Sequence, residues 1–496
     1  MDDLLNLYAS LDNPDPSKNL NKNVQKQKPK AQKKLIQKKP LVTQKKKEVK
    51  PDSKPNNNKI NNNKYDPLSI FTPKKQSDDN DDTNIIPGTE DIKSKIDIKN
   101  IESIIDNLND KNYKYKSVEE LQNLLNKKAE ENNLKTEENQ AFLVYCWITK
   151  NLSYYIGSKP DNTPLGALQK RITQCSGYAR LFKELLKIFK IKSVLVHGCG
   201  RTYSLSIKPK IENHEWNAVK LNGQYYLCEV TWGSGKVENG KFIPSYNTYY
   251  FCCPPDQFIQ THLPSKDLDK WQLLSKKISQ NDFDNLLYKD KFFYFYGFNE
   301  ITPNEGVVKL NNQNIHEMKI INQRNVKSLR LSCKVYLENI LCENASCIEK
   351  LDNYFLIHLI FNKKGKYNTL IFATDKSGTA QSDLIVRQQY LVSSNQKENL
   401  FFPTMLTFPD DLHIIQHKYN NIQKNKEIIF KFRSDDIDDM GIVIDKKCSH
   451  LEKNENVFEG KFIVKGDEIL IGKFTPDNPG NLKVMIKYNI KKKNNI

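Results

Sequence analysis

The spacing of the apolar residues changes once along this chain, after about residue 190, and that change constrains the fold more than any other feature. Before it, apolar residues recur at helical spacing, as Ile101, Ile104, Ile105 and Leu108 do. After it, short runs bounded by turn residues predict strands, beginning with Ser193–His197 and a turn at residues 198–200. A helical front followed by antiparallel strands predicts an α+β fold.

Two helix starts are visible in the front part. Ser117 stands three residues before Glu120, which is the pattern of a capping box. Thr136 is followed by Glu137 and Glu138, so a third helix is expected to begin there with acidic residues in its favourable first turn. The residues after Thr136 are apolar enough to predict a mostly buried helix.

The net charge of +18 is concentrated near the N-terminus. Between residues 18 and 64 there are sixteen lysines against Glu48 and Asp52, or 16 − 2 = +14, which leaves about +4 for the rest. Such a polar segment cannot bury enough apolar surface to fold, so residues 1–90 are predicted to be a disordered tail with a short apolar motif at residues 1–12. The tail could contact acidic surfaces or be a solvated linker. Nucleic acid is disfavoured because the tail has no arginine and almost no aromatic residue.

The rest of the chain divides into three predicted domains. Residues 91–290 carry the helices and the first strands, and residues from about Phe292 are strand-like throughout. Two similar segments there, one starting at Gly365 and one at Gly480, predict two β-sandwich-like modules at 291–398 and 399–496. A single large β region is the alternative.

Cysteine use and targeting signals predict a reduced, cytoplasmic protein. The ten cysteines include no Cys-x-x-Cys pair, and the chain is long enough to build its own core without disulfides. The first residues lack the basic and apolar regions of a signal peptide, and no apolar run approaches the length of a membrane span. No metal or cofactor site is expected, because paired metal-ligand spacings and calcium loops are absent from the sequence.

Cys175 is the strongest candidate for chemistry. It stands where a loop turns into a helix that carries Leu181, Leu185 and Leu186 on one face. Unpaired N–H groups and the helix dipole at such a position favour a thiolate, the nucleophilic form of cysteine. The alternative is a small buried apolar residue, which is the usual role of a free cysteine.

A predicted hairpin supplies a base and an acid for Cys175. Asn222-Gly223 is a strong two-residue turn between His214–Leu221 and Gln224–Val230. In that register His214 faces Thr231, and Glu229 lies two residues away on the same face, within reach of a cross-strand diagonal contact. A cysteine nucleophile needs such a base and a third group to orient it.

These residues and their surroundings resemble the transglutaminase-like superfamily of papain-type cysteine enzymes, in particular the kyphoscoliosis-peptidase and hillarin branch. The matching segments are Trp147-Ile148-Thr149-x-Asn151-Leu152-x-Tyr154, Cys175-x-Gly177-Tyr178-Ala179-x-Leu181-Phe182, His214-x-Trp216-Asn217-x-Val219, Glu229-Val230-Thr231-Trp232-Gly233-Ser234-Gly235, Pro255-x-x-Phe258-Ile259-x-x-His262-Leu263-Pro264 and Trp271-Gln272-Leu273-Leu274. The resemblance implies a papain-like transglutaminase core over residues 91–290.

The resemblance also implies the roles of the residues. Cys175 would be the nucleophile, His214 the general base and Glu229 the acid that orients His214, although the family usually has the shorter Asp there. By position, Gln174 is a candidate second oxyanion donor beside the N–H of Cys175. Trp216 and Trp232 are candidates for the cleft wall, with a core role as the alternative.

Two functions follow from the resemblance. The first is a cysteine peptidase or protein acyltransferase that forms a thioester on protein amides. The second is a catalytically degenerate scaffold that binds cytoskeletal or signalling proteins. If Glu229 orients His214, the shorter acid in Glu229→Asp is expected to preserve or raise activity.

Overall fold

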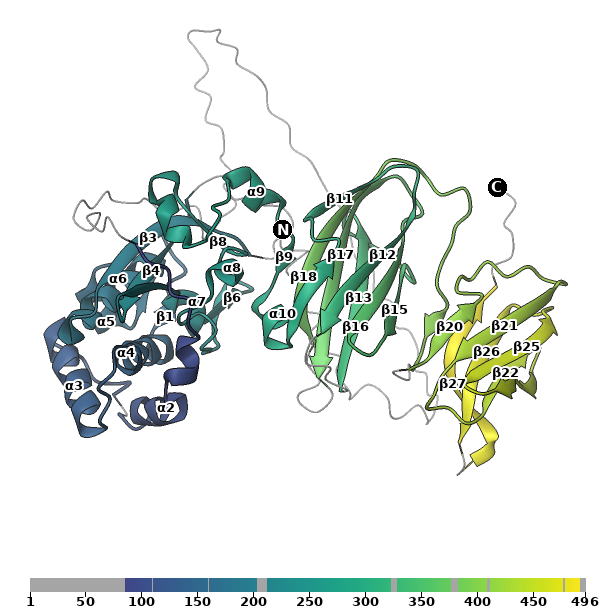
Figure 1. The fold of residues 1–496 in the computed structure, drawn as a ribbon, viewed down its shortest axis with the longest axis horizontal. Helices are drawn as coiled ribbons and strands as arrows, with labels where there is room; N and C mark the ends of the chain where they lie inside the picture. Colours follow the sequence, from purple (N-terminus) through teal and green to yellow (C-terminus); the bar gives the residue numbers. More distant parts are fainter. Residues whose placement is uncertain are drawn as a thin grey trace, which may run out of the picture.

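The computed structural model describes residues 85–108, 110–158, 160–202, 212–322, 328–375, 382–407, 411–475 and 478–490. Within this part of the chain, a lobe of helices around a small sheet comes first and two β-sandwich modules follow it in a row (Figure 1). This is the predicted α+β architecture. The predicted tail lies outside the described residues up to residue 84, together with the apolar motif of residues 1–12.

The predicted helix starts are confirmed. The Ser117 side chain accepts the N–H of Glu120, and the Thr136 side chain accepts the N–H of Asn139. No described helix is both long and apolar enough to cross a membrane. The helical elements of this front part are η2 (Ile92–Lys95), α2 (Ile98–Asp106), α3 (Val118–Glu131), α4 (Glu137–Asn151), α5 (Pro164–Lys170), α6 (Cys175–Leu186) and η3 (Lys187–Phe189).

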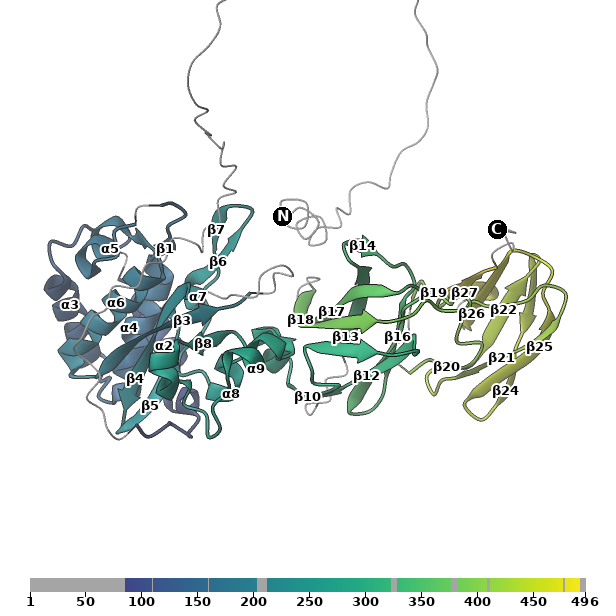
Figure 2. The same cartoon turned by 90° about the horizontal axis from the view of Figure 1, so that it is seen from above.

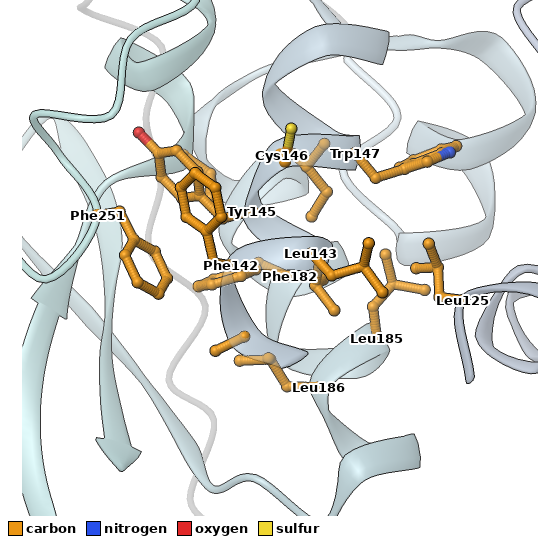
Figure 3. Packing of buried hydrophobic residues seen from close by; sticks show 14 of the residues in the cluster. Leu125, Phe142, Leu143, Tyr145, Cys146, Trp147, Phe182, Leu185, Leu186 and Phe251 are labelled. Carbon is orange, nitrogen blue, oxygen red and sulfur yellow. The ribbon is translucent and has the colours of Figure 1, made fainter. Parts of the chain in front are cut away.

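Helix α4 forms the centre of the first core. All of its residues from 141 to 149 are buried. Phe142 and Tyr145 meet Phe251 edge to face, with ring centroids 5.1 and 5.2 Å apart (Figure 3). Leu185 of α6 and Leu125 of α3 belong to the same cluster (Figure 3). This packing holds α6, and therefore Cys175 at its start, against a rigid neighbour.

The sheet of the first lobe has the strand order β5-β4-β3-β8, with β3 at Ser193–Gly200, β4 at His214–Leu221, β5 at Gln224–Cys228 and β8 at His262–Pro264. The predicted hairpin and its register are confirmed, since Leu221 pairs with Gln224 across the turn. Asn222 and Gly223 both have positive φ, of 49° and 82°, as a tight hairpin turn requires.

Two details of this sheet differ from prediction. Strand β3 continues through Gly198 and Gly200, because these residues pair with β8 rather than forming a turn. Strand β5 ends at Cys228, and the chain then turns into the short helix α7 (Val230–Ser234). Glu229 is therefore a helix cap and not a strand residue.

The remaining elements of the lobe surround this sheet, and the β6–β7 hairpin projects from it (Figure 2). They are β1 (Ser153–Tyr154), β2 (Ile172–Thr173), β6 (Gly235–Glu238), β7 (Lys241–Pro244), α8 (Pro255–Phe258), η4 (Lys266–Gln272) and α9 (Gln280–Asn285). Before them in the chain, Ile86 and Gly88 already form backbone hydrogen bonds with Tyr225 of β5.

The first β-sandwich module has the sheets β10-β12-β16-β15 and β11-β18-β17-β13-β14, and β9 pairs with β18. The prediction of strands throughout is wrong at its start, where α10 (Lys291–Phe295) precedes them. The strands are β9 (Tyr288–Lys289), β10 (Phe298–Thr302), β11 (Val307–Leu310), β12 (Ile315–Asn322), β13 (Leu329–Leu337), β14 (Ile340–Leu341), β15 (Ser346–Lys350), β16 (Tyr354–Ile360), β17 (Gly365–Asp375) and β18 (Asp383–Val392).

The second β-sandwich module has the sheets β20-β21-β25-β24 and β19-β27-β26-β22-β23. Its strands are β19 (Thr404–Met405), β20 (His413–Gln416), β21 (Glu427–Arg433), β22 (Met440–Ile444), β23 (Lys447–His450), β24 (Glu452–Asn454), β25 (Val457–Ile463), β26 (Glu468–Thr475) and β27 (Asn478–Asn489).

The two modules repeat one strand order, although the short edge strand is parallel to its neighbour in the first module (β11 with β18) and antiparallel in the second (β19 with β27). In each, the last long strand lies between a short edge strand and the strand before it, and the order of the facing sheet also corresponds. This correspondence matches β17 with β26, whereas the sequence match pairs β17 with β27. The prediction of two modules is right, but the segments that suggested it are not equivalent strands.

Candidate active site

Cys175 is the first residue of α6 and is 3% exposed. The carbonyl of Gln174 accepts the N–H groups of Gly177 and Tyr178, and no side chain caps this end of the helix. The N–H of Cys175 therefore has no acceptor within the helix and lies at the positive end of its dipole. Gly177 is required for packing, because a Cβ there would lie 1.9 Å from Thr173 Oγ1.

His214 begins β4 and contacts both other members of the predicted triad. Its Nε2 lies 2.6 Å from Glu229 Oε2, and the neighbouring Cys175 side chain helps to raise the pKa of the ring. Because Nε2 is committed to Glu229, Nδ1 is the nitrogen left for the sulfur. Gly200 of β3 makes room for the ring, since a Cβ there would lie 3.1 Å from the Cβ of His214.

Glu229 uses its two carboxylate oxygens for two purposes. Oε1 accepts the N–H groups of Thr231 and Trp232 at 2.5 and 3.1 Å, which caps α7, while Oε2 faces His214. The sequence argument brought Glu229 to His214 from a strand. In the structure it approaches His214 from the N-cap position of α7, after the strand has ended at Cys228.

The charges of this group favour an ion pair. Burial alone would lower the pKa of His214, but the Glu229 carboxylate and the hydrogen bonds with Cys175 and Glu229 raise it to about 10. Burial alone would raise the pKa of Glu229, but the charge of His214, the hydrogen bond from His214 and the nearby His262 ring hold it well below its usual range. The imidazole is therefore expected to be an imidazolium near neutral pH.

The other predicted residues lie around this group in different ways. Trp232 is half-buried and its ring centroid is 5.4 Å from that of His214. Trp216 is fully buried and packs against Phe258, so it is a core residue beneath the site. The Gln174 amide donates to the carbonyls of Tyr155 and Gly157 at 3.4 and 3.1 Å. Serving as an oxyanion donor would require this amide to leave those carbonyls.

His262 is a further member of the cluster for which the sequence predicted no role. It lies on β8, is fully buried, and has its Nε2 3.6 Å from Glu229 Oε2. Its register partner is Gly200, the same glycine that makes room for His214. His262 belongs to a motif of the resembled branch, but it follows Glu229 by 33 positions with no local geometry to connect them.

The ring nitrogens and carboxylate of His214, Glu229 and His262 lie within 4.8 Å of one another, a grouping that could suggest a metal site. The 2.6 Å contact between His214 and Glu229 is a hydrogen-bond distance. Two ligands on one zinc ion, each about 2.0–2.1 Å from it in tetrahedral geometry, would stand more than about 3 Å apart. The arrangement fits a proton between the two atoms better than a metal ion.

Comparison with known proteins shows which family this part of the chain is similar to. Residues 125–230 match the family model described as "Transglutaminase-like superfamily", and this range contains Cys175, His214 and Glu229. Kyphoscoliosis peptidase from Mus musculus is 30% identical over 176 residues, which cover 34% of this chain and 26% of that protein.

Two other relatives match the chain over a similar length. Hillarin from Drosophila melanogaster is 26% identical over 192 residues, covering 35% of this chain and 23% of that protein. "Lim and transglutaminase domain protein ltd-1" from Caenorhabditis elegans is 27% identical over 176 residues, covering 32% and 24%. The chain thus spans about a quarter of the length of the curated relatives it matches.

Proposed function

Because this chain carries a transglutaminase-like domain of the branch that contains kyphoscoliosis peptidase and hillarin, we propose that it is a cysteine peptidase or protein acyltransferase with Cys175 as its nucleophile. The contact chain from Cys175 through His214 to Glu229 carries this proposal. A nucleophile, a base and an orienting acid in contact are the parts that thioester chemistry requires.

The proposed reaction proceeds in two steps. The Cys175 thiolate attacks the carbonyl carbon of an amide, and the oxyanion is stabilised by the N–H of Cys175 and a second donor. The proton on His214 Nδ1 passes to the leaving nitrogen, the C–N bond breaks and a thioester remains. His214 then takes a proton from water or from a primary amine, which attacks the thioester and releases Cys175.

Glu229 supports both steps without touching the substrate. It holds His214 through Nε2, so Nδ1 stays directed at the sulfur, and it stabilises the imidazolium form. The caps on α7 hold the carboxylate in turn. This chemistry needs no cofactor or metal.

The substrate and partners of the proposed enzyme are proteins. In line with the family resemblance, we propose a cytoplasmic location and a cytoskeletal partner, with the two β-sandwich modules as the binding part. The same modules could serve a catalytically degenerate scaffold. That alternative predicts partner binding without turnover.

An activated ester, p-nitrophenyl acetate, tests the proposal without knowledge of the substrate. The full chain is expected to give a burst of p-nitrophenolate and an acetyl group on Cys175, found by mass spectrometry. Adding a primary amine should speed deacylation of an acyltransferase and leave a strict hydrolase unchanged. Cys175→Ala is the control. Acetylation of Cys175 no faster than that of Cys448, an exposed cysteine on β23, would refute the enzyme and favour the scaffold.

A further inference from the structure

We propose that His262 is a positioning residue of this active site, whose Nε2–H is directed at the Glu229 carboxylate and holds that oxygen against His214. This inference rests on the proposed function and adds a residue to its machinery. Nε2 of His262 lies 3.6 Å from Glu229 Oε2, the same oxygen that accepts from His214 at 2.6 Å. His262 and Glu229 are both 0% exposed.

A hydrogen on Nε2 fits the contacts of His262. On the other side of the ring, Nδ1 lies 2.8 Å from Thr261 Oγ1. The Thr261 hydroxyl has one hydrogen, and its other acceptor, the carbonyl of Phe258, is farther away at 3.4 Å. If Thr261 donates to Nδ1, a neutral imidazole carries its hydrogen on Nε2. The opposite tautomer would direct a lone pair at a buried carboxylate.

A neutral ring fits this place. Burial lowers the pKa of His262 to about 4, so the ring carries no charge near neutral pH. A second imidazolium beside Glu229 would compete with His214 for the carboxylate and repel it. A neutral N–H instead gives a dipole that stabilises the carboxylate and leaves the charge pair to His214 and Glu229.

The packing of His262 explains why its ring does not move. It stacks on Phe258 with centroids 4.3 Å apart, and Trp232 lies 4.5 Å away on centroids. Apart from Glu229 and Thr261, its neighbours are thus mainly aromatic. A buried imidazole among aromatic rings is costly unless its polar atoms are used, and Nε2 has no partner closer than Glu229 among the described residues.

His262 also accounts for how a glutamate serves at this position. The glutamate side chain has one more rotatable bond than that of aspartate, so it has more ways to turn away from His214. Oε1 is fixed by the two N–H groups of α7, and His262 supplies a donor for Oε2. Donors on both oxygens restrict rotation of the carboxylate and keep Oε2 in line with His214.

Alkylation of Cys175 by iodoacetamide, read at each cysteine by mass spectrometry in the full chain, tests this role. Cys448 gives the reference rate within each sample. His262→Phe keeps the aromatic packing and removes the donor, and it is expected to slow Cys175 about tenfold, short of the roughly hundredfold cost of a 1 Å displacement. His262→Gln can place an amide N–H where Nε2 stands and should retain most of the rate. His358→Phe, in the first β module, is the matched control and should leave the rate unchanged.

A double-mutant cycle separates positioning from mere packing. In a Glu229→Ala background, His262→Phe should cause no further loss, because the group through which it acts is gone. If His262→Phe does not fold, His262→Asn replaces it, since its shorter amide can reach Thr261 but not Glu229.

The outcomes distinguish the two proposals. An unchanged rate in His262→Phe, or an equal loss with and without Glu229, would overturn the role of His262 alone. A wild-type Cys175 no faster than Cys448 would overturn the proposed function and this inference together.

Discussion

The pairs His214–Glu229 and His358–Glu349 each join a buried histidine to a glutamate, but their surroundings differ. His214 lies 2.6 Å from Glu229 in the first lobe, and His358 lies 2.9 Å from Glu349 in the first β module. Both histidines are almost fully buried, at 4% and 3% exposed. Burial also acts on both carboxylates, and in each case hydrogen bonds and charges still hold the pKa well below its usual range.

The difference lies in what the rest of each pair touches. The second side of His214 faces the Cys175 thiol, which can react. The second side of His358 faces another carboxylate, with Nδ1 2.8 Å from Glu317. Glu349 also binds Lys418 at 2.7 Å and His413 at 3.3 Å, both from the second β module.

The comparison shows that a buried His–Glu pair alone does not identify a catalytic site. Around His358 the nearby groups are acids and a lysine, so the pair forms an ionic contact that joins the two β modules. Around His214 one nitrogen is left for a nucleophile. The reactive neighbour distinguishes the two, and the following variants test that distinction.

Loss of the histidine should have the largest effect. His214→Asn removes the base and the imidazolium, so alkylation of Cys175 by iodoacetamide should fall about 10²–10⁴-fold. His358→Asn should leave that rate unchanged and lower the thermal unfolding midpoint. Equal effects of the two variants on Cys175 would contradict the comparison.

Removing the charge of the glutamate should lower the reactivity of Cys175 in one pair and the stability of the protein in the other. Glu229→Gln should slow Cys175 by about tenfold to a hundredfold, because the imidazolium loses its partner. Glu349→Gln should spare Cys175 and reduce stability by about 2 kcal/mol, the range of a hydrogen bond to a charged group. Alkylation rates and thermal unfolding of both variants decide between these outcomes.

Shortening the acid gives a smaller effect, opposite in sign to the one that the sequence alone suggests. The turn into α7 places the Glu229 backbone for a long side chain that reaches both α7 and His214. Glu229→Asp should therefore slow Cys175 about tenfold, because the shorter side chain keeps the negative charge but holds it less closely against His214. A rate equal to or above that of the wild type would show that the backbone adapts to either acid.

The smallest of the expected effects is the dependence of thermal stability on pH. The folded-state pKa of His214 is raised from 6.5 to about 10, so the stabilisation it provides is complete below pH 6.5 and is lost as the pH rises toward about 10. The lowered pKa of Glu229 acts at the other end, where stabilisation present above pH 4.5 is lost on acidification. The thermal unfolding midpoint of the wild type should fall as the pH rises from 6.5 toward about 10. The His214→Asn variant should show a smaller fall over the same range.

The sequence predicts much of this arrangement because much of it is local. The turn at Asn222-Gly223 and the caps at Ser117 and Thr136 depend on neighbours in the chain, and the structure has all three. Glu229 was harder, because the helix that it caps has only five residues and no apolar period. Its approach to His214 was expected, but from a strand.

What could not be predicted depends on contacts distant in sequence. His262 reaches Glu229 because its strand, β8, pairs with β3. Strand β3 is distant in sequence from both His262 and Glu229. Gly198 and Gly200 resemble a turn in sequence, yet they form the strand that lets His214 and His262 approach. The equivalence of β17 and β26 likewise follows from the order of the strands in the two sheets. A match between alternating residues in the sequence carries no information about that order.

The most direct test of the central claim is the pH profile of Cys175 alkylation in the wild-type chain, measured against Cys448 in the same samples. A Cys175 sulfur activated by His214 should react faster than Cys448 between about pH 6 and about pH 8, and its rate should depend less on pH than that of Cys448. A Cys175 rate that rises in parallel with that of Cys448, and does not exceed it, would contradict the account.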